Sequence, residues 1–184
     1  MKIENVQIYG LEESIKRAKF PMSVDIYGLD SELTNGIKSL ANSGTGEGHD
    51  QWLTGVIVQF DVTASIKWWT EAQRYHFLDF VSSQSTMHRA TKFEIEKQCN
   101  KYVDQDVMRV IKKLVSIHGE NPTEENYLRV LYNIPTGFQL TAGMTTNYRQ
   151  LKTIYKQRQN HRLPEWNTFC DWVETLPHSE LITN

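Results

Sequence analysis

Residues 147–158 read NYRQLKTIYKQR, and this stretch decides how the second half of the chain is organised. Each residue of a helix advances 100° around the axis, so Asn147 and Arg158 would lie about 20° apart. Apolar side chains at helical spacing share that face: Leu151, Ile154 and Tyr155. The opposite face carries cations: Arg149, Lys152 and Lys156. The stretch therefore predicts an amphipathic helix whose apolar stripe includes an arginine.

Arg158 is the most unusual residue of this predicted helix. A guanidinium on an apolar stripe must find a carboxylate, a cluster of carbonyls or an anionic ligand, because burying its charge unpaired is very costly. Two interpretations stay open: an ion pair within the protein or between subunits, and a ligand anchor. Arg149, on the opposite face, reads as solvated unless a neighbouring subunit covers it. Asn147 reads as the helix N-cap, alone or together with a ligand contact.

Composition predicts one globular domain over residues 1–184. The chain has 23% charged and 39% hydrophobic residues, which is ordinary for a soluble protein. Its formal net charge of −2 gives no electrostatic support for nucleic-acid binding. No stretch approaches the roughly 20 apolar residues that span a bilayer, and the N-terminus lacks a signal-peptide pattern, so we expect a cytoplasmic protein without a membrane partner. Cys99 and Cys170 are isolated and offer no metal-ligand spacing.

The remaining pattern predicts an α+β fold, with a central antiparallel or mixed sheet flanked by helices. In the clearest strand, residues 56–62, four apolar side chains alternate with other residues: Val56, Val58, Phe60 and Val62. Further candidate strands are residues 6–9, 24–27 and 137–141. Residues 42–48, NSGTGEG, read either as a plain surface loop or as a cradle for a phosphate.

Helices are predicted mainly in the second half of the chain. An aromatic-rich helix should run from residue 64 to about residue 80 and end near residues 82–85, whose hydroxyl and amide side chains favour helix ends. An amphipathic helix further on should close at Gly119, and Asn121 should cap the next one. Pro164 should open the last helix.

Residues 82–89, SSQSTMHR, collect hydroxyls, an amide and a guanidinium. Such a set can bind a phosphate and the edge of a base, or it can be a polar turn with a surface arginine. Three histidines could be general acids or bases, or could be structural: His49, His76 and His88. The sequence contains no nucleophile elbow, zinc triad, Walker lysine or dinucleotide-binding glycine fingerprint.

The order and spacing of several polar residues resemble the flavin-dependent thymidylate synthases over about residues 48–165. In that family a Gly-His pair precedes a strand, and an Arg-His-Arg signature precedes a serine. A proline then lies twelve residues before Asn-x-Arg, and another arginine follows nine residues beyond, as in this chain. The residues that carry the pattern here are Gly48, His49, Ser85, Pro135, Asn147, Arg149 and Arg158.

The resemblance implies a homotetramer that converts dUMP to dTMP with methylenetetrahydrofolate, using FAD as hydride carrier and NADPH as reductant. The expected function is thus an enzyme acting at C5 of a pyrimidine deoxynucleotide. One alternative is a nucleotide-binding protein on the same fold that has lost flavin chemistry, and a weaker one is an assembly protein that keeps only the oligomeric scaffold. Arg158 would be the catalytic residue, polarising the uracil. The implied substrate-binding residues are Gln84, Ser85, Thr86, Arg89 and Arg158. The implied cofactor-binding residues are His49, Arg74, His76, Asn147, Arg149 and Arg162.

The chain departs from the family at the signature itself. Tyr75-His76-Phe77 stands where Arg-His-Arg is expected, or Arg74-Tyr75-His76 if one residue is inserted. Thr86-Met87 replaces the Gly-Arg that follows the serine. Arginines at shifted positions could replace the missing charges: Arg89, Arg129 and Arg162.

Overall fold

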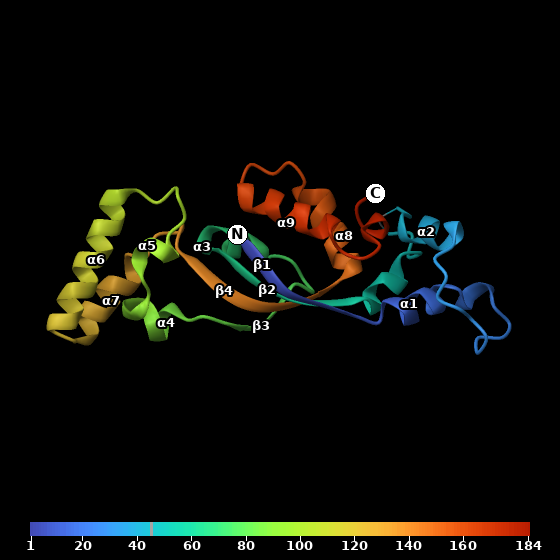
Figure 1. Ribbon diagram of the computed structural model, residues 1–184, viewed down its shortest axis with the longest axis horizontal. Helices are drawn as coiled ribbons and strands as arrows, with labels where there is room; N and C mark the ends of the chain where they lie inside the picture. The colour runs from blue at the N-terminus through green and yellow to red at the C-terminus, as the bar shows by residue number, and fades with distance from the viewer. Residues whose placement is uncertain (45) are drawn as a thin grey trace.

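A computed structural model describes residues 1–44 and 46–184 of the chain. In this part of the chain, the sheet has four strands in the order β1-β2-β4-β3, and every neighbouring pair is antiparallel. The strands are β1 (Lys2–Tyr9), β2 (Ile57–Ser65), β3 (Asp79–Ser83) and β4 (Gln139–Asn147). The predicted α+β class and the antiparallel form of the sheet are therefore confirmed, and Figure 1 shows the long central strands β2 and β4 side by side.

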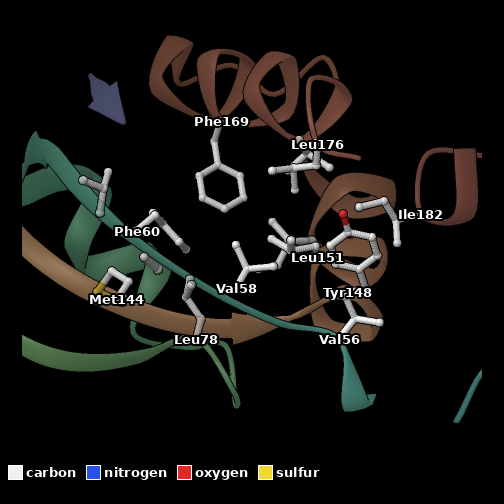
Figure 2. Packing of buried hydrophobic residues seen from close by; sticks show 14 of the residues in the cluster. Val56, Val58, Phe60, Leu78, Met144, Tyr148, Leu151, Phe169, Leu176 and Ile182 are labelled. Atoms are coloured by element: carbon white, nitrogen blue, oxygen red, sulfur yellow. The ribbon is translucent and has the colours of Figure 1, made fainter. Parts of the chain in front are cut away.

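Strand β2 supplies one wall of the main core, as its alternation predicts. Val58, Phe60 and Val62 are buried, whereas Gln59 between them is exposed. Helices α8 (Tyr148–Arg158) and α9 (Pro164–Glu174) cover this face of the sheet (Figure 1). Figure 2 shows their apolar side chains meeting those of β2 and β4 in one packed layer. Burial of this layer, which also includes two indole rings of α3 (Ile66–Ala72) and α9, is the main stabilising term of the fold.

Strand β4 runs directly into helix α8. Asn147 ends the strand opposite Ile57, and its side-chain oxygen accepts a hydrogen bond of 2.9 Å from the backbone N–H of Gln150. Asn147 is therefore the N-cap of α8, as predicted, and it satisfies a helix N–H that has no partner within the helix. The apolar stripe of α8 is also confirmed, because Leu151 and Ile154 are buried.

Helical segments extend the molecule at both ends of the sheet (Figure 1). At one end lie α1 (Leu11–Ala18), α2 (Asn35–Ala41) and the short 3-10 helices Phe20–Met22 and Gln51–Gly55. The other end is an arm made of α4 (Thr86–Arg89), the 3-10 helix Ala90–Lys92, α5 (Ile95–Gln98), α6 (Gln105–Glu120) and α7 (Glu124–Tyr132). A last 3-10 helix, Ser179–Leu181, follows α9. No helix among the described residues is both long and apolar enough to cross a bilayer.

The aromatic-rich helix is shorter than predicted. Helix α3 ends at Ala72, and the chain turns and returns as strand β3 on the edge of β4. Trp69 of α3 and Phe80 of β3 face each other across this turn, with ring centroids 4.9 Å apart. The prediction failed because a run of aromatic residues suits either a helix or a strand, and pairing with β4, distant in sequence, decides between them. Residues 82–85 consequently end a strand rather than a helix, and Ser85 precedes α4.

Other boundaries also differ from the predictions. Residues 24–27 form no strand, and Val24 and Tyr27 are exposed. Gly119 lies inside the last turn of α6. Thr123, not Asn121, caps α7, because its hydroxyl accepts the Asn126 N–H at 3.2 Å.

Of two further predictions, one strand had the wrong bounds, and one loop can be assessed only in part. The extended segment predicted at 137–141 begins as a strand at Gln139 and continues to Asn147. The predicted glycine loop at 42–48 includes residue 45, which lies outside the described residues.

Candidate functional site

A cavity of about 570 Å³ opens where α8 begins, beside the 3-10 helix Gln51–Gly55 and the turn before β3. Its lining combines cations, amides and an aromatic ring. The lining residues are Asp50, Gln51, Thr54, Ile57, Phe77, Asn147, Arg149, Gln150, Lys152, Thr153, Lys156 and Gln157. Three cations face a single carboxylate, so the cavity favours an anionic or carbonyl-rich ligand.

Asp50 organises the cationic wall of the cavity. Its side chain is only 8% exposed, and the carboxylate accepts hydrogen bonds from Arg149 Nε and Lys152 Nζ, each at 2.9 Å. Lys152 uses its remaining donors on the carbonyl oxygens of Ala41 and Ser43, at 2.6 and 3.0 Å. Arg149 also donates to Gln51 Oε1 at 2.8 Å. The Arg149 side chain is thus partly exposed but is held in place by Asp50 and Gln51. The helical pattern had instead predicted a solvated side chain.

Asn147 presents its amide group to the same cavity. It is 9% exposed, and its oxygen is fixed by the cap of α8. The amide nitrogen is therefore the group that it can offer to a ligand, as a donor whose position is set by the strand-to-helix junction. Asn147 and Arg149 both line the cavity.

Phe77 is the aromatic member of the cavity. The ring is 65% exposed, and the backbone has φ of 63°, in the left-handed region that bulky residues rarely adopt. Holding Phe77 there costs on the order of 1–2 kcal/mol. An exposed aromatic ring in a strained turn beside a cavity points to a stacking surface for a planar ligand.

Arg158 lies at the C-terminal end of α8 and does not line this cavity, although the preceding residue, Gln157, does. Its side chain is largely buried. Its Nη1 is 3.1 Å from Glu71 Oε2, and its Nε donates to the Tyr75 hydroxyl at 2.6 Å. His161 Nε2 lies 2.9 Å from Nη1, and the guanidinium stacks over the Trp166 ring, 4.6 Å from its centroid. The sequence left open whether Arg158 forms an ion pair or anchors a ligand, and the structure shows that it forms an ion pair with Glu71 of the same chain. Its Nη2 has no hydrogen-bond partner among residues 1–44 and 46–184.

Glu71 is the counter-ion of Arg158. Burial acts to raise the pKa of Glu71, but hydrogen bonds from Trp166 and Lys67, with the charges of Lys67 and Arg158, outweigh burial and lower the pKa below its ordinary value. Glu71 therefore stays ionised near neutral pH and balances the charge of Arg158.

The predicted phosphate-binding residues lie elsewhere on the molecule. Ser83 pairs with Ala142, five residues before Asn147 on β4, so the Gln84–Arg89 segment begins roughly 17 Å from the cavity along the strand. Gln84 Oε1 accepts the backbone N–H of Thr141 at 2.9 Å. The Tyr127 hydroxyl lies 3.0 Å from the carbonyl oxygens of both Thr86 and Met87, which fixes α4 on the arm. A single chain therefore does not bring Ser85 and Arg89 to the cavity.

The other predicted cofactor residues are on the surface. His49, Arg74, His76 and Arg162 are exposed and do not line the cavity. Sequence reasoning missed Asp50, Lys152 and Phe77 as site residues. Asp50 directly follows the Gly48-His49 pair, and this position could have identified it as a candidate site residue. No local sequence pattern predicts the strained turn at Phe77.

The cysteines give no sign of a reactive thiol. Burial, with smaller effects of Asp171 and Glu174, raises the pKa of Cys170 to about 11, and burial also raises the pKa of Cys99. A thiol with a raised pKa is a poor nucleophile near neutral pH. Among the described residues, no group of three or more His, Cys, Asp or Glu side chains is placed to hold a metal ion.

The whole chain superimposes on solved structures of known enzymes. One is the flavin-dependent thymidylate synthase ThyX from Helicobacter pylori complexed with FAD and dUMP, with a TM-score of 0.76 and 16% identity over 99% of this chain and 98% of that one. Another is thymidylate synthase X from Helicobacter pylori with FAD and dUMP, with a TM-score of 0.76 and 15% identity over 100% and 97% of the two chains. No protein-family model and no curated protein sequence matches the chain. The protein therefore has the fold of these flavin-dependent thymidylate synthases, at a sequence identity that establishes the fold alone.

Proposed function

We propose that the protein binds a flavin and a pyrimidine deoxynucleotide and acts at C5 of the pyrimidine, with conversion of dUMP to dTMP as the default reaction. The observation that carries the proposal is the cavity at the start of α8, where Asn147 and Arg149 meet the exposed ring of Phe77 on a thymidylate synthase fold. The resemblance in sequence implies flavin contacts for the same two residues, Asn147 and Arg149.

The residues of the cavity fit a flavin. Phe77 offers a face for stacking a planar ring, Asn147 offers an amide donor for a ring carbonyl, and Arg149 with Lys156 favours the phosphates. FAD, when bound, would supply hydride transfer, with NADPH as reductant and methylenetetrahydrofolate as one-carbon donor. Asp50 would keep Arg149 in one orientation, so little side-chain entropy is lost on binding.

Arg158 would act on the pyrimidine as a fixed cation. Tyr75, Glu71 and His161 hold Nε and Nη1, which leaves Nη2 to donate to a carbonyl oxygen of the base. A positioned donor stabilises negative charge that develops on the ring, and such electrostatic stabilisation needs no protein nucleophile. The raised thiol pKa values of both cysteines agree with a reaction that does not use one.

A complete site would draw on several copies of the chain. The Gln84–Arg89 segment begins roughly 17 Å from the cavity in one chain, so Gln84, Ser85, Thr86 and Arg89 would bind the nucleotide phosphate at the site of another copy. The homotetramer implied by the sequence resemblance would meet this need. The exposed His49, Arg74, His76 and Arg162 are proposed to complete the flavin site across the same interfaces.

The second candidate function is nucleotide binding without flavin chemistry. It is favoured by the loss of signature arginines: Tyr75 and Phe77 stand at their positions when the segment is aligned on Ser85, and only Arg74 is kept if one residue is inserted. Tyr75 is already used to hold Arg158, so it does not replace a missing charge.

Calorimetric titration of dUMP tests the role of Arg158. Arg158→Ala should weaken binding by about 1.5–3 kcal/mol, or roughly 10- to 150-fold, if Nη2 makes a charge-assisted bond to the base. Arg158→Lys, which keeps a charge beside Glu71, serves as the folded control, and circular dichroism checks both variants. Equal dUMP affinity of wild type and Arg158→Ala would eliminate the anchor role. Binding of dUMP by a protein that takes up no FAD would favour the second candidate function.

A further inference from the structure

The hydroxyl group of Tyr75 connects the cavity to Arg158. It accepts a hydrogen bond of 2.6 Å from Arg158 Nε and donates one of 3.0 Å to Gln157 Oε1. Gln157 lines the cavity, whereas Arg158, the next residue of α8, is paired with Glu71. Neighbouring side chains of a helix point about 100° apart, and Tyr75, in the turn that follows α3, bridges these two. Two consecutive hydrogen bonds therefore join the cavity wall to the guanidinium.

The chemistry of the three groups fixes the direction of these hydrogen bonds. A guanidinium only donates, so the Tyr75 oxygen accepts from Arg158 and keeps its single hydrogen for Gln157. That hydrogen needs an acceptor, so the Gln157 amide turns Oε1 toward Tyr75 and leaves Nε2 as the donor that it can offer to a ligand. Gln157 is exposed, and a ligand that accepts from Nε2 would restrict the rotamers of this side chain.

The same hydroxyl sets the orientation of Arg158. The planar guanidinium is held at Nη1 by Glu71, at 3.1 Å, and at Nε by Tyr75. Two fixed nitrogens define the plane of the group and hence the direction of Nη2. Without the hydroxyl, the guanidinium could turn about its contact with Glu71. The Tyr75 ring would still pack edge to face on Trp166, with centroids 5.8 Å apart, so the hydroxyl rather than the ring orients Nη2.

We propose that Tyr75 is a positioning residue that couples the binding of FAD in the cavity to the binding of the pyrimidine at Arg158. The inference rests on the proposed function. FAD that accepts from Gln157 Nε2 holds Gln157 in place and, through Tyr75, the guanidinium as well. The side-chain freedom of this chain of groups is then lost with the first ligand, and the second ligand binds more tightly. Linkage makes the effect reciprocal, so dUMP raises the affinity for FAD by the same factor.

Calorimetric titration of dUMP, without FAD and at saturating FAD, measures the coupling as the ratio of the two dissociation constants. In wild type the dissociation constant should be larger without FAD. Tyr75→Phe, which removes only the hydroxyl, should lower the ratio by at least about threefold. Direct contact between the two ligands would contribute equally in both proteins, so the comparison isolates the hydroxyl. A purely structural role of Tyr75 would change stability, or both dissociation constants together, and would leave the ratio unchanged.

A second variant tests whether the coupling passes through Gln157. Gln157→Met keeps the length of the side chain but removes its amide, and it should lower the ratio by the same factor as Tyr75→Phe. The double variant should lower the ratio no further, because both changes break one connection. Gln150→Met is the matched control, since Gln150 lines the same cavity on the same helix and no hydrogen bond joins it to Tyr75 in the described part of the chain. Its ratio should equal that of wild type, whatever its affinity for FAD.

The outcomes separate this coupling from the proposed function. A wild-type ratio of one, an unchanged ratio in Tyr75→Phe, or effects that multiply in the double variant would each overturn the coupling. Where wild type still binds both ligands, the proposed function stands and the coupling alone is refuted. A wild type that fails to bind FAD or dUMP refutes the proposed function and the coupling together. Circular dichroism confirms that each variant is folded.

Discussion

Replacement of Asp50 by alanine tests the claim that this carboxylate organises the cavity. Asp50 is nearly inaccessible and carries two ion pairs of 2.9 Å. Removing one partner of a fully buried pair costs about 3–5 kcal/mol, because the remaining charge is left uncompensated. Here the cost is reduced, since Lys152 keeps two carbonyl acceptors and Arg149 reaches solvent. We therefore expect Asp50→Ala to lower the free energy of unfolding by about 2–3 kcal/mol.

Urea denaturation followed by tryptophan fluorescence measures this loss. Glu13→Ala, which breaks an exposed ion pair with Lys16, is the control and should leave the unfolding midpoint unchanged. In the double variant Asp50→Ala/Lys152→Met the stranded ammonium is removed as well, so part of the stability should return. A loss below about 1 kcal/mol for Asp50→Ala, or no recovery in the double variant, would refute the reasoning.

Three further outcomes follow from the structure. The pKa of Glu71 is lower in the folded protein than its ordinary value of 4.5, so ionised Glu71 stabilises the fold above pH 4.5 and this contribution is lost as the pH falls further. Glu71→Gln should thus cost stability at pH 7, with a deficit that shrinks below about pH 4.5 in urea titrations; a pH-independent deficit would contradict this. In the variant Cys99→Ser, which leaves Cys170 as the remaining thiol, Cys170, with a pKa of about 11, should react with a thiol reagent at pH 8 only after unfolding, and rapid labelling of the folded variant would argue against its burial. Phe77→Asn should keep the free energy of unfolding within about 1 kcal/mol of wild type, because asparagine tolerates the left-handed backbone, and should weaken FAD binding; unchanged FAD affinity would remove the stacking role.

Elements with a strong local pattern were predictable from the sequence. Apolar residues recur with a period of 2 in strand β2 and of 3.6 in helix α8. The cap at Asn147 joins it to Gln150, only three residues further on, so it could be predicted from the local sequence. The α+β class followed from these elements. Strand β3 was not predictable in this way, because its partner β4 lies about sixty residues away and its aromatic residues suit a helix equally well.

The site was predictable only in part for a related reason. Asn147 and Arg149 could be placed on one helix start, but the partner of Arg149 comes from residue 50, almost a hundred residues earlier. Arg158 was recognised as a cation that needs a partner, yet periodicity cannot tell a carboxylate of α3 from a ligand. Phe77 enters the cavity through a strained backbone, which depends on how the chain turns from α3 into β3.

Titration of FAD into wild type, Arg149→Met and Phe77→Leu, followed by flavin absorbance and fluorescence, tests the central claim most directly. If the cavity at the start of α8 is the flavin site, wild type takes up FAD, and each variant binds it at least about fivefold more weakly while remaining folded. Val24→Glu, remote from the cavity, binds FAD like wild type. A wild type that takes up no FAD at any concentration, or variants that bind it equally well, would contradict the account.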